Sequence, residues 1–322
     1  MTRAHWLDRA YVRLTRPGSF FEDGWGGEGD AREHAAPAFA AQVATPVIRW
    51  GRARRVADRV ERAGTFESPL ASELPAESRV AHVTWISPAR RQARAAVVLL
   101  GATGDVGPRR RARFAAPLVR DGVGALILEN PYYGPRKPPR QRGVDVRTVA
   151  DLLLLGRAAV DEARALVGWA SEQHGAVALS GYSMGGQLSA MAAATLSIPV
   201  AVVPVAAPAS ASAVFVDGLL SRATSWRALS GVADPRAALV ERLDALSLPR
   251  LPVPVCPRAA ILVGARRDGY VAPRSVEALH RHWPGSELRW IDEGHVSGYV
   301  RSAAPARAAV LDALERLRAA SS

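Results

Sequence analysis

The stretch Ser180-Gly181-Tyr182-Ser183-Met184-Gly185-Gly186 separates an apolar, strand-like run (residues 176–179) from a run that favours a helix (residues 187–196). A G-x-S-x-G sequence in this setting is typical of the nucleophile elbow, a tight strand-to-helix turn that exposes a serine hydroxyl. Glycine on either side lets the turn close, because larger side chains there would collide. We therefore predict that Ser183 is a nucleophile. The alternative is a glycine-rich loop with one surface serine, since so short a pattern recurs by chance.

Length and charge limit the function classes. A chain of 322 residues suits one large α/β domain with an insertion, or two domains of ordinary size. The net charge is +12, but Lys137 is the only lysine, and the arginines are scattered among alanines without a nucleic-acid-binding motif. We expect no nucleic acid partner. The charge favours an anionic partner, such as a phosphorylated substrate or an acidic membrane surface.

The compartment is predicted from cysteine usage and apolar runs. Cys256 is the single cysteine and has no disulfide partner within the chain, which fits a reducing compartment. Residues 1–16 have an amphipathic pattern, with Trp6 and Leu14 among arginines that include Arg3 and Arg16, and lack the apolar centre of a secretion signal. Prolines interrupt the longest uncharged interval, residues 175–216. We predict a cytoplasmic protein, with a peripheral contact to an anionic membrane as an additional possibility.

Strand-like and helix-like runs alternate after an irregular first segment that ends near Pro75, which predicts a mostly parallel sheet flanked by helices, as in an α/β-hydrolase fold. Expected strands cover residues 80–86, 96–100, 124–128, 176–179, 200–205, 259–263 and 287–291; expected helices cover residues 109–120, 145–172, 184–196, 273–282 and 305–319. The predicted organisation is an N-terminal arm (1–78) that packs on the core or on a membrane, a core (79–206 and 258–322), and a helical cap insertion (207–257) over the carboxyl ends of the strands.

A serine nucleophile needs a histidine base and a carboxylate that orients it. In α/β hydrolases these follow the serine in the order Asp or Glu, then His. Asp268 comes directly after one predicted strand and His295 after the next, so the order is met. Glu293 is a rival for the orienting carboxylate. We predict a triad of Ser183, Asp268 and His295, with the backbone amides of Met184 and Thr103 as oxyanion donors. No histidine has metal-ligand spacing, and we expect neither a metal nor a cofactor.

Two alternatives of other classes stay open. A dinucleotide-binding oxidoreductase is one alternative, because its glycine-rich motif is matched by the loop Gly101-Ala102-Thr103-Gly104-Asp105-Val106-Gly107. Glu129 after the next strand and the pair Tyr133 and Lys137 also fit such an enzyme. Prolines around Tyr133 and Lys137 prevent the helix that such an enzyme needs. The second alternative is a hydrolase-like fold kept as a non-catalytic binding module.

Polar and aromatic side chains on the loops after consecutive strands are candidates for substrate binding, because such loops converge at the carboxyl edge of a parallel sheet. The candidates are Asp105, Tyr132, Tyr133, Arg136 and Lys137. We expect the two cations near the pocket mouth, where they would favour an anionic head group. The alternative is that the tyrosines pack the loop onto the core and both cations are solvated.

Several longer strings resemble the α/β-hydrolase-domain-containing protein 18 family. The strings are Leu-Asp-Arg-Ala-Tyr at 7–11, Gly24-Trp25-Gly26, Thr103-Gly104-Asp105, Leu128-Glu129-Asn130-Pro131-Tyr132-Tyr133-Gly134, Arg136-Lys137-Pro138, Ser183-Met184-Gly185-Gly186, Ala211-Ser212-Ala213-Val214-Phe215, Ser225-Trp226-Arg227, Trp283-Pro284-Gly285 and Gly294-His295-Val296-Ser297. The resemblance implies a serine hydrolase that acts on an acyl ester, with Ser183, Asp268 and His295 as its triad. Animal members have glycine in place of Ala102 and histidine in place of Gln187. The basic surface and apolar cap suggest a lipid or phospholipid ester. The sequence leaves the oligomeric state open.

Overall fold

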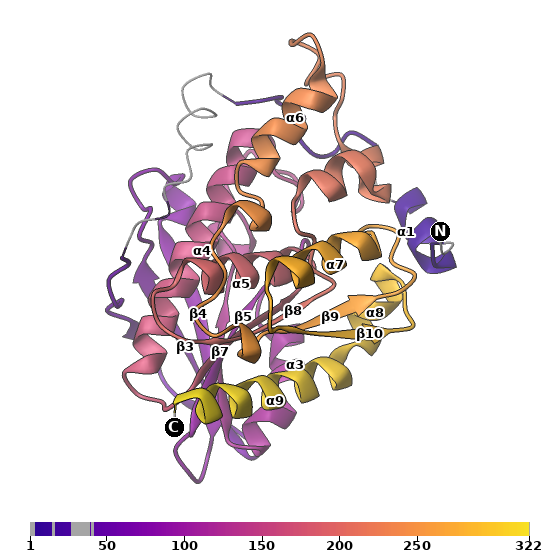
Figure 1. Cartoon of the computed structure of the whole chain (residues 1–322). Helices are drawn as coiled ribbons and strands as arrows, with labels where there is room; N and C mark the ends of the chain where they lie inside the picture. The colour runs from indigo at the N-terminus through magenta and orange to yellow at the C-terminus, as the bar shows by residue number, and fades with distance from the viewer. Residues whose placement is uncertain (1–3, 15–16, 27–38, 40–41, 322) are drawn as a thin grey trace.

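The computed structural model describes residues 4–14, 17–26, 39 and 42–321, and Arg3 and Arg16 lie outside these ranges (Figure 1). Within the described residues, ten strands form one sheet, in the order β1-β3-β4-β6-β5-β7-β8-β9-β10 with β2 paired to β3. The strands are β1 (Arg49–Trp50), β2 (Arg54–Val56), β3 (Arg59–Glu67), β4 (Val80–Pro88), β5 (Ala95–Leu100), β6 (Val123–Leu128), β7 (Val177–Tyr182), β8 (Ala201–Val205), β9 (Ile261–Ala265) and β10 (Glu287–Ile291).

The sheet has a parallel part and an antiparallel part. Strands β5 to β10 pair in parallel, and their carboxyl ends therefore meet at one edge. Strands β1 to β4 extend the sheet beyond β6 with antiparallel pairs. Strands β5 and β6 are buried along their whole length, as expected for strands covered by helices on both faces.

Helices cover the two faces of the sheet (Figure 1). The helices are α1 (Trp6–Leu14), α3 (Arg109–Arg120), α4 (Val149–Ser171), α5 (Met184–Thr195), α6 (Pro235–Asp244), α7 (Pro273–His282), α8 (His295–Arg301) and α9 (Ala303–Ser321). Helices α4, α5 and α7 pack in one apolar cluster with the sheet, and α3 and α9 pack in a second cluster on the opposite face. Both faces of the parallel strands are thereby removed from water, which is the main source of stability for such a sheet.

The predicted fold class, a mostly parallel sheet flanked by helices, is confirmed, and each predicted strand and helix overlaps an observed one. The prediction of an irregular first segment up to Pro75 is wrong, because β1, β2 and β3 form within it. Strand β3 reads Arg-Val-Glu-Arg-Ala-Gly-Thr-Phe-Glu and buries only Gly64 and Phe66. Its pairing with β4 holds it in the sheet, so its own apolar pattern is too weak to predict it.

Residues 207–257 connect β8 to β9 without forming a strand. They contain η3 (Ala213–Asp217), η4 (Leu219–Ala223), α6 and η5 (Leu248–Arg250). This segment lies at the end of the sheet where the parallel strands finish, with α6 farthest from it (Figure 1). Helix α1 packs against η4 and α8, so this helix lies at the same edge.

Candidate active site

Ser183 occupies the turn between β7 and α5. Its φ of 54° is one that L-residues rarely adopt, as a sharp turn between a strand and a helix demands. A Cβ on Gly181 would lie 2.4 Å from the carbonyl carbon of Gly185, and a Cβ on Gly185 would lie 2.4 Å from the carbonyl oxygen of Leu100. Only glycine fits at either position. The Ser183 amide donates to the carbonyl of Val205 at 2.8 Å, which ties the turn to β8.

Ser183, His295 and Asp268 form a continuous hydrogen-bonded chain. The Ser183 Oγ lies 2.9 Å from Nε2 of His295, and Nδ1 of His295 lies 2.7 Å from Oδ2 of Asp268. Asp268 follows β9, and His295 opens α8 just after β10. The structure thus brings the three predicted residues together from three strand ends. The rival carboxylate, Glu293, pairs instead with Arg301 at 3.3 Å.

The second oxygen of Asp268 fixes the carboxylate. Its Oδ1 accepts hydrogen bonds from the amides of Tyr270 at 2.8 Å and Val271 at 2.7 Å. The carboxylate is buried, with only 2% of its side-chain surface exposed. Its orientation toward His295 is therefore set by the backbone of its own loop, and the other oxygen is left for the imidazole.

The charge balance around His295 favours the protonated imidazole. Burial, the largest single effect, lowers the pKa of His295, but the charge of Asp268, its hydrogen bond and the charge of Asp8 raise it, and the net pKa lies above the ordinary value of 6.5. Tyr270 stacks on the ring at a centroid distance of 5.1 Å, and Tyr182 lies at 5.2 Å on a tilted plane. The Tyr182 hydroxyl donates to the carbonyl of His295 at 2.6 Å. Sequence reasoning missed both tyrosines, and only the place of Tyr182 beside the elbow serine could have pointed to it.

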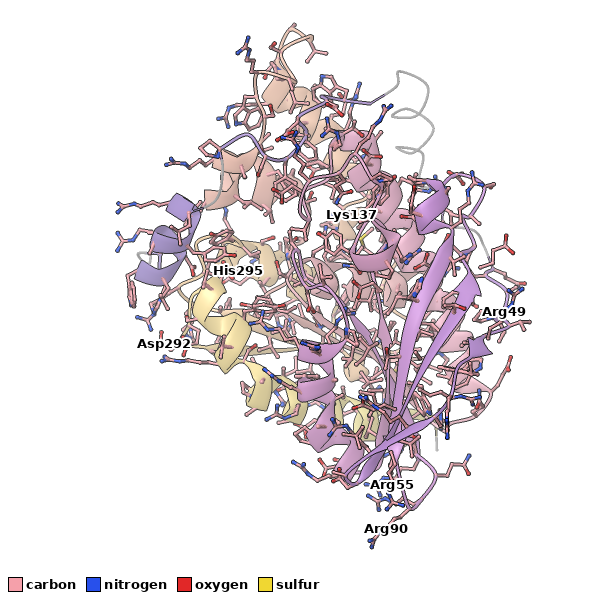
Figure 2. All side chains as sticks on the ribbon, turned by 180° about the vertical axis from the view of Figure 1, so that it is seen from behind. Arg49, Arg55, Arg90, Lys137, Asp292 and His295 are labelled. Carbon is pink, nitrogen blue, oxygen red and sulfur yellow. The ribbon has the colours of Figure 1, made fainter. Side chains whose placement is uncertain are left out.

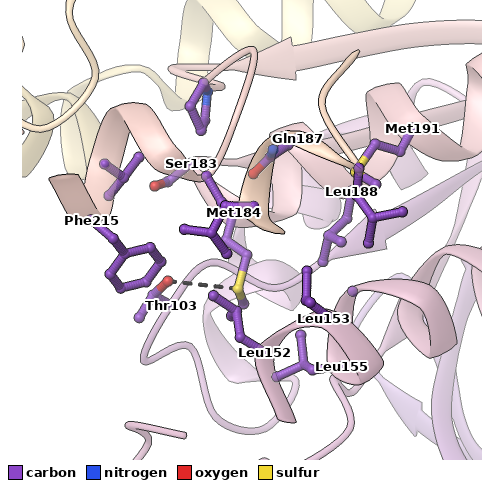
Figure 3. Close-up of a pocket in the computed structure, with 16 residues that line it drawn as sticks. Thr103, Leu152, Leu153, Leu155, Ser183, Met184, Gln187, Leu188, Met191 and Phe215 are labelled. Atoms are coloured by element: carbon purple, nitrogen blue, oxygen red, sulfur yellow. Dashed lines mark hydrogen bonds between the residues drawn. The ribbon is translucent and has the colours of Figure 1, made fainter. Parts of the chain in front are cut away.

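The loop after β5 faces the start of α5. The Thr103 hydroxyl lies 3.7 Å from the sulfur of Met184, so the two residues predicted to supply oxyanion donors are in contact (Figure 3). Met184 is the first residue of α5, where a backbone amide has no partner within the helix. Behind the loop, the buried Tyr133 hydroxyl is hydrogen-bonded to the backbone of Gly104 and the side chain of Thr103, and burial raises its pKa above the ordinary value. The Asn130 amide also holds this loop by donating to the carbonyl of Gly101 at 3.0 Å.

A narrow apolar cavity of about 70 Å³ begins at Ser183 (Figure 3). Its walls come from α4, α5 and the segment between β8 and β9. The lining includes Leu152, Leu188, Met191, Phe215, Leu243 and Leu246. Gln187, where animal members of the similar family have histidine, also lines it. An apolar group attached to a carbonyl at Ser183 would be shielded from water in this cavity.

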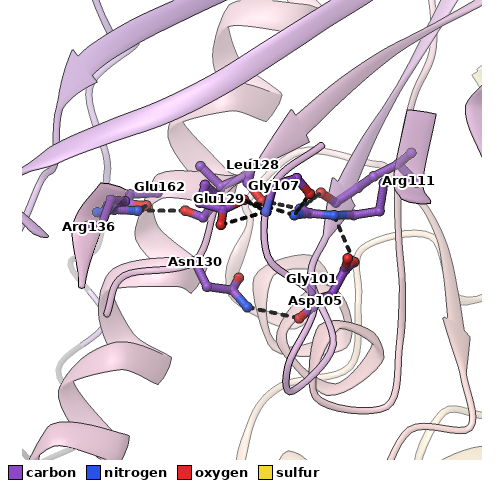
Figure 4. Close-up of polar contacts among 10 residues, drawn as sticks. Gly101, Asp105, Gly107, Arg111, Leu128, Glu129, Asn130, Arg136 and Glu162 are labelled. Carbon is purple, nitrogen blue, oxygen red and sulfur yellow. Dashed lines mark hydrogen bonds and ion pairs between the residues drawn. The ribbon is translucent and has the colours of Figure 1, made fainter. Parts of the chain in front are cut away.

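The five residues predicted to bind substrate lie elsewhere. None of them lines the cavity at Ser183. The expected position of Arg136 at the pocket mouth is corrected by the structure: its side chain is fully buried and pairs through both terminal nitrogens with Glu162, at 2.7 and 2.5 Å (Figure 4). Tyr132 and Tyr133 are also buried, which matches the alternative in which they pack the loop onto the core. Lys137, labelled in Figure 2, is exposed and does not line that cavity.

Asp105 and Glu129 belong to a buried ionic cluster behind the loop (Figure 4). Arg111 contacts Asp105 at 3.0 Å and Glu129 at 3.2 Å, and Glu129 accepts the amide of Gly107 at 2.9 Å. Burial raises the pKa of both carboxyls, and the Arg111 charge opposes that shift. Glu129 is thus committed to the loop and is not presented to a ribose. Tyr133 and Lys137 flank the short turn η2 (Gly134–Arg136), so the helix that a dehydrogenase needs is absent from this described segment.

The serine at a strand-to-helix turn, with an aspartate and a histidine on two later loops of the same sheet edge, defines the α/β-hydrolase architecture. Solved structures share it. They include an acetyl xylan esterase from Paenibacillus sp. R4 (TM-score 0.59, 15% identity, covering 92% of this chain and 98% of the other). Another is acetyl xylan esterase 1 from Thermoanaerobacterium sp. JW/SL YS485 (TM-score 0.59, 14% identity, covering 89% of this chain and 92% of the other). A third is brefeldin A esterase, a bacterial homologue of human hormone-sensitive lipase (TM-score 0.51, 13% identity, covering 83% of this chain and 81% of the other). At these identities the likeness shows the fold.

Within that class, the chain belongs to the family alpha/beta hydrolase domain containing 18, whose sequence profile matches residues 18–243 and 232–316. The resemblance predicted from the sequence strings is confirmed. Over the described ranges, no three histidine, cysteine or carboxylate side chains are grouped so that they could hold a metal ion. No helix in the described part of the chain has the length and apolar character needed to cross a membrane.

Proposed function

We propose that this protein is a serine hydrolase that cleaves acyl esters through an acyl-enzyme intermediate. The observation that carries the proposal is the hydrogen-bonded chain from Ser183 Oγ through His295 to Asp268, with distances of 2.9 and 2.7 Å. Family membership and the esterase fold support it. A strained serine, a base within hydrogen-bond reach and a buried orienting carboxylate are the parts that acyl transfer needs.

In the proposed reaction, the Ser183 oxygen attacks the ester carbonyl while Nε2 of His295 takes its proton. The Asp268 carboxylate holds the proton on Nδ1 and stabilises the imidazolium that forms. The backbone amides of Met184 and Thr103 donate to the oxyanion of the tetrahedral intermediate. The imidazolium then protonates the departing alcohol oxygen, and a water molecule activated by His295 releases the acid and restores Ser183.

The substrate class follows from the cavity. Its lining of leucine, methionine and phenylalanine side chains suits an acyl chain, and each buried methylene contributes about 0.8 kcal/mol to binding. We propose an ester with an apolar acyl group, such as a lipid or phospholipid ester. We also propose that residues 207–257 act as the cap, because Val214, Phe215 and Leu243 complete the wall.

We further propose peripheral contact with an anionic membrane through the outer side of α1. Trp6 and Leu14 are 62% and 84% exposed, and Arg9 and Arg13 are exposed beside them. Apolar and aromatic side chains flanked by arginines are typical of helices that lie in a membrane interface. A net charge of +12 adds long-range attraction to acidic lipids. This contact would place the edge that carries Ser183 near a lipid substrate.

Labelling with a fluorophosphonate probe tests the proposed chemistry. The wild-type protein should be labelled, and Ser183→Ala should lose labelling together with ester turnover, with a loss in rate on the order of 10⁴ to 10⁶. Ser230→Ala, which changes an exposed serine outside the site, is the matched control and should label like the wild type. Equal labelling of the wild type and Ser183→Ala would reject Ser183 as the nucleophile.

A further inference from the structure

Asp8, on the N-terminal helix α1, is a buried carboxylate beside the proposed triad. Its side chain is fully removed from solvent, although it lies in a short helix near the start of the described chain. Its Oδ2 accepts hydrogen bonds from the amides of Gly269 at 2.9 Å and His295 at 2.8 Å, and its Oδ1 accepts one from the amide of Val296 at 2.8 Å. A carboxylate is costly to bury, and these three bonds offset that cost.

The three amides belong to the two loops that carry the triad partners. Gly269 follows Asp268 directly, and His295 and Val296 open α8. A single side chain, 287 positions away from His295 in the sequence, therefore joins the aspartate loop to the histidine loop. Because its two oxygens reach three amides, Asp8 restrains both loops relative to each other. A further backbone bond from the amide of His5 to the carbonyl of Arg267, at 2.9 Å, fixes α1 to the aspartate loop.

Glycines next to both triad partners make room for α1. A Cβ on Gly294 would lie 2.4 Å from the Cβ of His5 and 2.8 Å from either oxygen of Asp8. A Cβ on Gly269 would lie 2.7 Å from Cδ1 of Leu219 in η4 and 3.0 Å from the Cβ of Ala4. Neither glycine has a positive φ, so the close approach of α1, and not the local backbone, explains why position 294 has no side chain.

We propose that Asp8 is a positioning residue of the active site, which holds His295 in register with Asp268 and Ser183 and supports the imidazolium through its charge. The inference rests on the proposed hydrolase function. It gives the N-terminal Leu-Asp-Arg-Ala-Tyr string a role that its sequence alone did not suggest.

The charge effect on His295 can be separated from simple packing. The groups that face the imidazole are Asp268 and Asp8, which are acidic, and Tyr182 and Tyr270, whose pKa values burial raises further above the ordinary value. Glu293 is nearby but engaged with Arg301. Among the acidic groups, both Asp268 and Asp8 raise the pKa of His295. Replacing Asp8 by a neutral side chain should therefore lower the pKa of His295, because the imidazolium loses a stabilising charge.

The test compares Asp8→Asn with Val12→Ala. Val12 is the other buried residue of α1, and its truncation weakens the packing of the helix without removing a hydrogen bond to either loop. Asp8→Asn should slow fluorophosphonate labelling and lower kcat by on the order of ten- to hundredfold, as small misplacements of catalytic groups do. KM should stay within about twofold, because Asp8 does not line the cavity. Val12→Ala should lower thermal stability and leave kcat within about threefold.

A titration of His295 by NMR gives a readout that does not depend on turnover. We expect its pKa to fall in Asp8→Asn and to remain at the wild-type value in Val12→Ala. Gly294→Ala, which would push Asp8 away from the histidine loop, should reproduce both the lower kcat and the lower pKa if Asp8→Asn fails to fold. If folded Asp8→Asn, or folded Gly294→Ala in its place, kept the wild-type kcat and the wild-type His295 pKa, the proposal would be overturned. Equal labelling of the wild type and Ser183→Ala would separately reject Ser183 as the nucleophile, while the titration would still decide the role of Asp8.

Discussion

The Nδ1 atom of His295 lies 2.7 Å from Oδ2 of Asp268, while Oδ1 of the same carboxylate accepts the amides of Tyr270 and Val271. This arrangement predicts that Asp268→Asn changes which nitrogen of His295 carries the proton. The asparagine oxygen must occupy the Oδ1 place, because two donors meet there, and its NH₂ group then faces His295. The imidazole is forced to carry its proton on Nε2, where it can no longer accept from Ser183. We expect kcat to fall on the order of 10⁴-fold with the fold intact.

Glu293→Gln is the matched control for Asp268→Asn. Glu293 stands closer to His295 in the sequence, but it pairs with the largely exposed Arg301, so its loss should change kcat by less than about threefold. Steady-state kinetics with a short ester measures both variants. A larger loss for Glu293→Gln than for Asp268→Asn would show that Glu293, and not Asp268, orients His295.

The pH dependence of kcat/KM should show an acidic limb that reports His295. The base must be neutral to accept the proton of Ser183, and the opposing effects of burial and of the Asp268 and Asp8 charges leave its pKa raised. Activity should therefore fall as pH decreases through an apparent pKa above 6.5, the ordinary value for histidine. A profile whose acidic limb lies at or below that value would contradict the charge balance seen around the ring.

The buried pair of Arg136 and Glu162 predicts a stability effect in place of a substrate effect. Glu162→Gln leaves the Arg136 charge uncompensated in the interior and should lower the free energy of unfolding by about 3 to 5 kcal/mol. Arg90→Ala, at an exposed arginine labelled in Figure 2, is the control and should stay within about 0.5 kcal/mol. Urea denaturation measures both. If Glu162→Gln instead changed the preference between anionic and neutral esters without lowering stability, Arg136 would act on substrate.

The parallel part of the fold and the order of the proposed triad were predictable because they depend on local patterns. Strand β5 is an unbroken apolar run, and the glycines around Ser183 serve a turn that no larger residue fits. Local apolar runs also predicted the two successive strands that Asp268 and His295 follow. These features are specified within a few residues of where they are used.

The rest depends on contacts between distant segments. Arg136 was expected near the pocket because its loop follows a strand, but only the structure reveals that its side chain is buried in an ion pair with Glu162 of α4. Strand β3 forms through pairing with β4, and Asp8 reaches loops more than 260 positions away. A side chain whose partner lies so far along the chain has no signal in its own neighbourhood. Its chemical type, here a carboxylate within an amphipathic helix, is all that the sequence offers.

The outer side of α1 predicts selective binding to anionic vesicles. Trp6→Ser combined with Leu14→Ser should reduce co-sedimentation with phosphatidylserine-containing vesicles, because each change removes an exposed apolar group from the interface. Added salt should weaken the wild-type binding, since it screens the arginines. Val47→Ser removes an apolar side chain that is 88% exposed elsewhere and serves as the control. Equal binding of the wild type to neutral and anionic vesicles would count against this surface as an anionic-membrane contact.

Gly156 offers a direct test of the acyl cavity. It lies in α4 and lines the cavity at Ser183, and a Cβ built on it meets no atom within 4 Å. Gly156→Phe should fill that space and exclude the outer methylenes of a long acyl chain. Losing two methylenes, at about 0.8 kcal/mol each, corresponds to roughly a tenfold drop in kcat/KM for a long-chain ester. Acetate esters should be hydrolysed almost as by the wild type.

Gly156→Ala is the matched control for Gly156→Phe. It adds one methyl group, leaves most of the cavity free, and should raise stability by about 0.5 to 1 kcal/mol, because glycine is unfavourable within a helix. A series of p-nitrophenyl esters of increasing acyl length gives the comparison. If Gly156→Phe lowered kcat/KM equally for every chain length, the acyl group would have to bind outside this cavity. A shift of the preferred length in Gly156→Phe alone would place the acyl chain between α4 and α5.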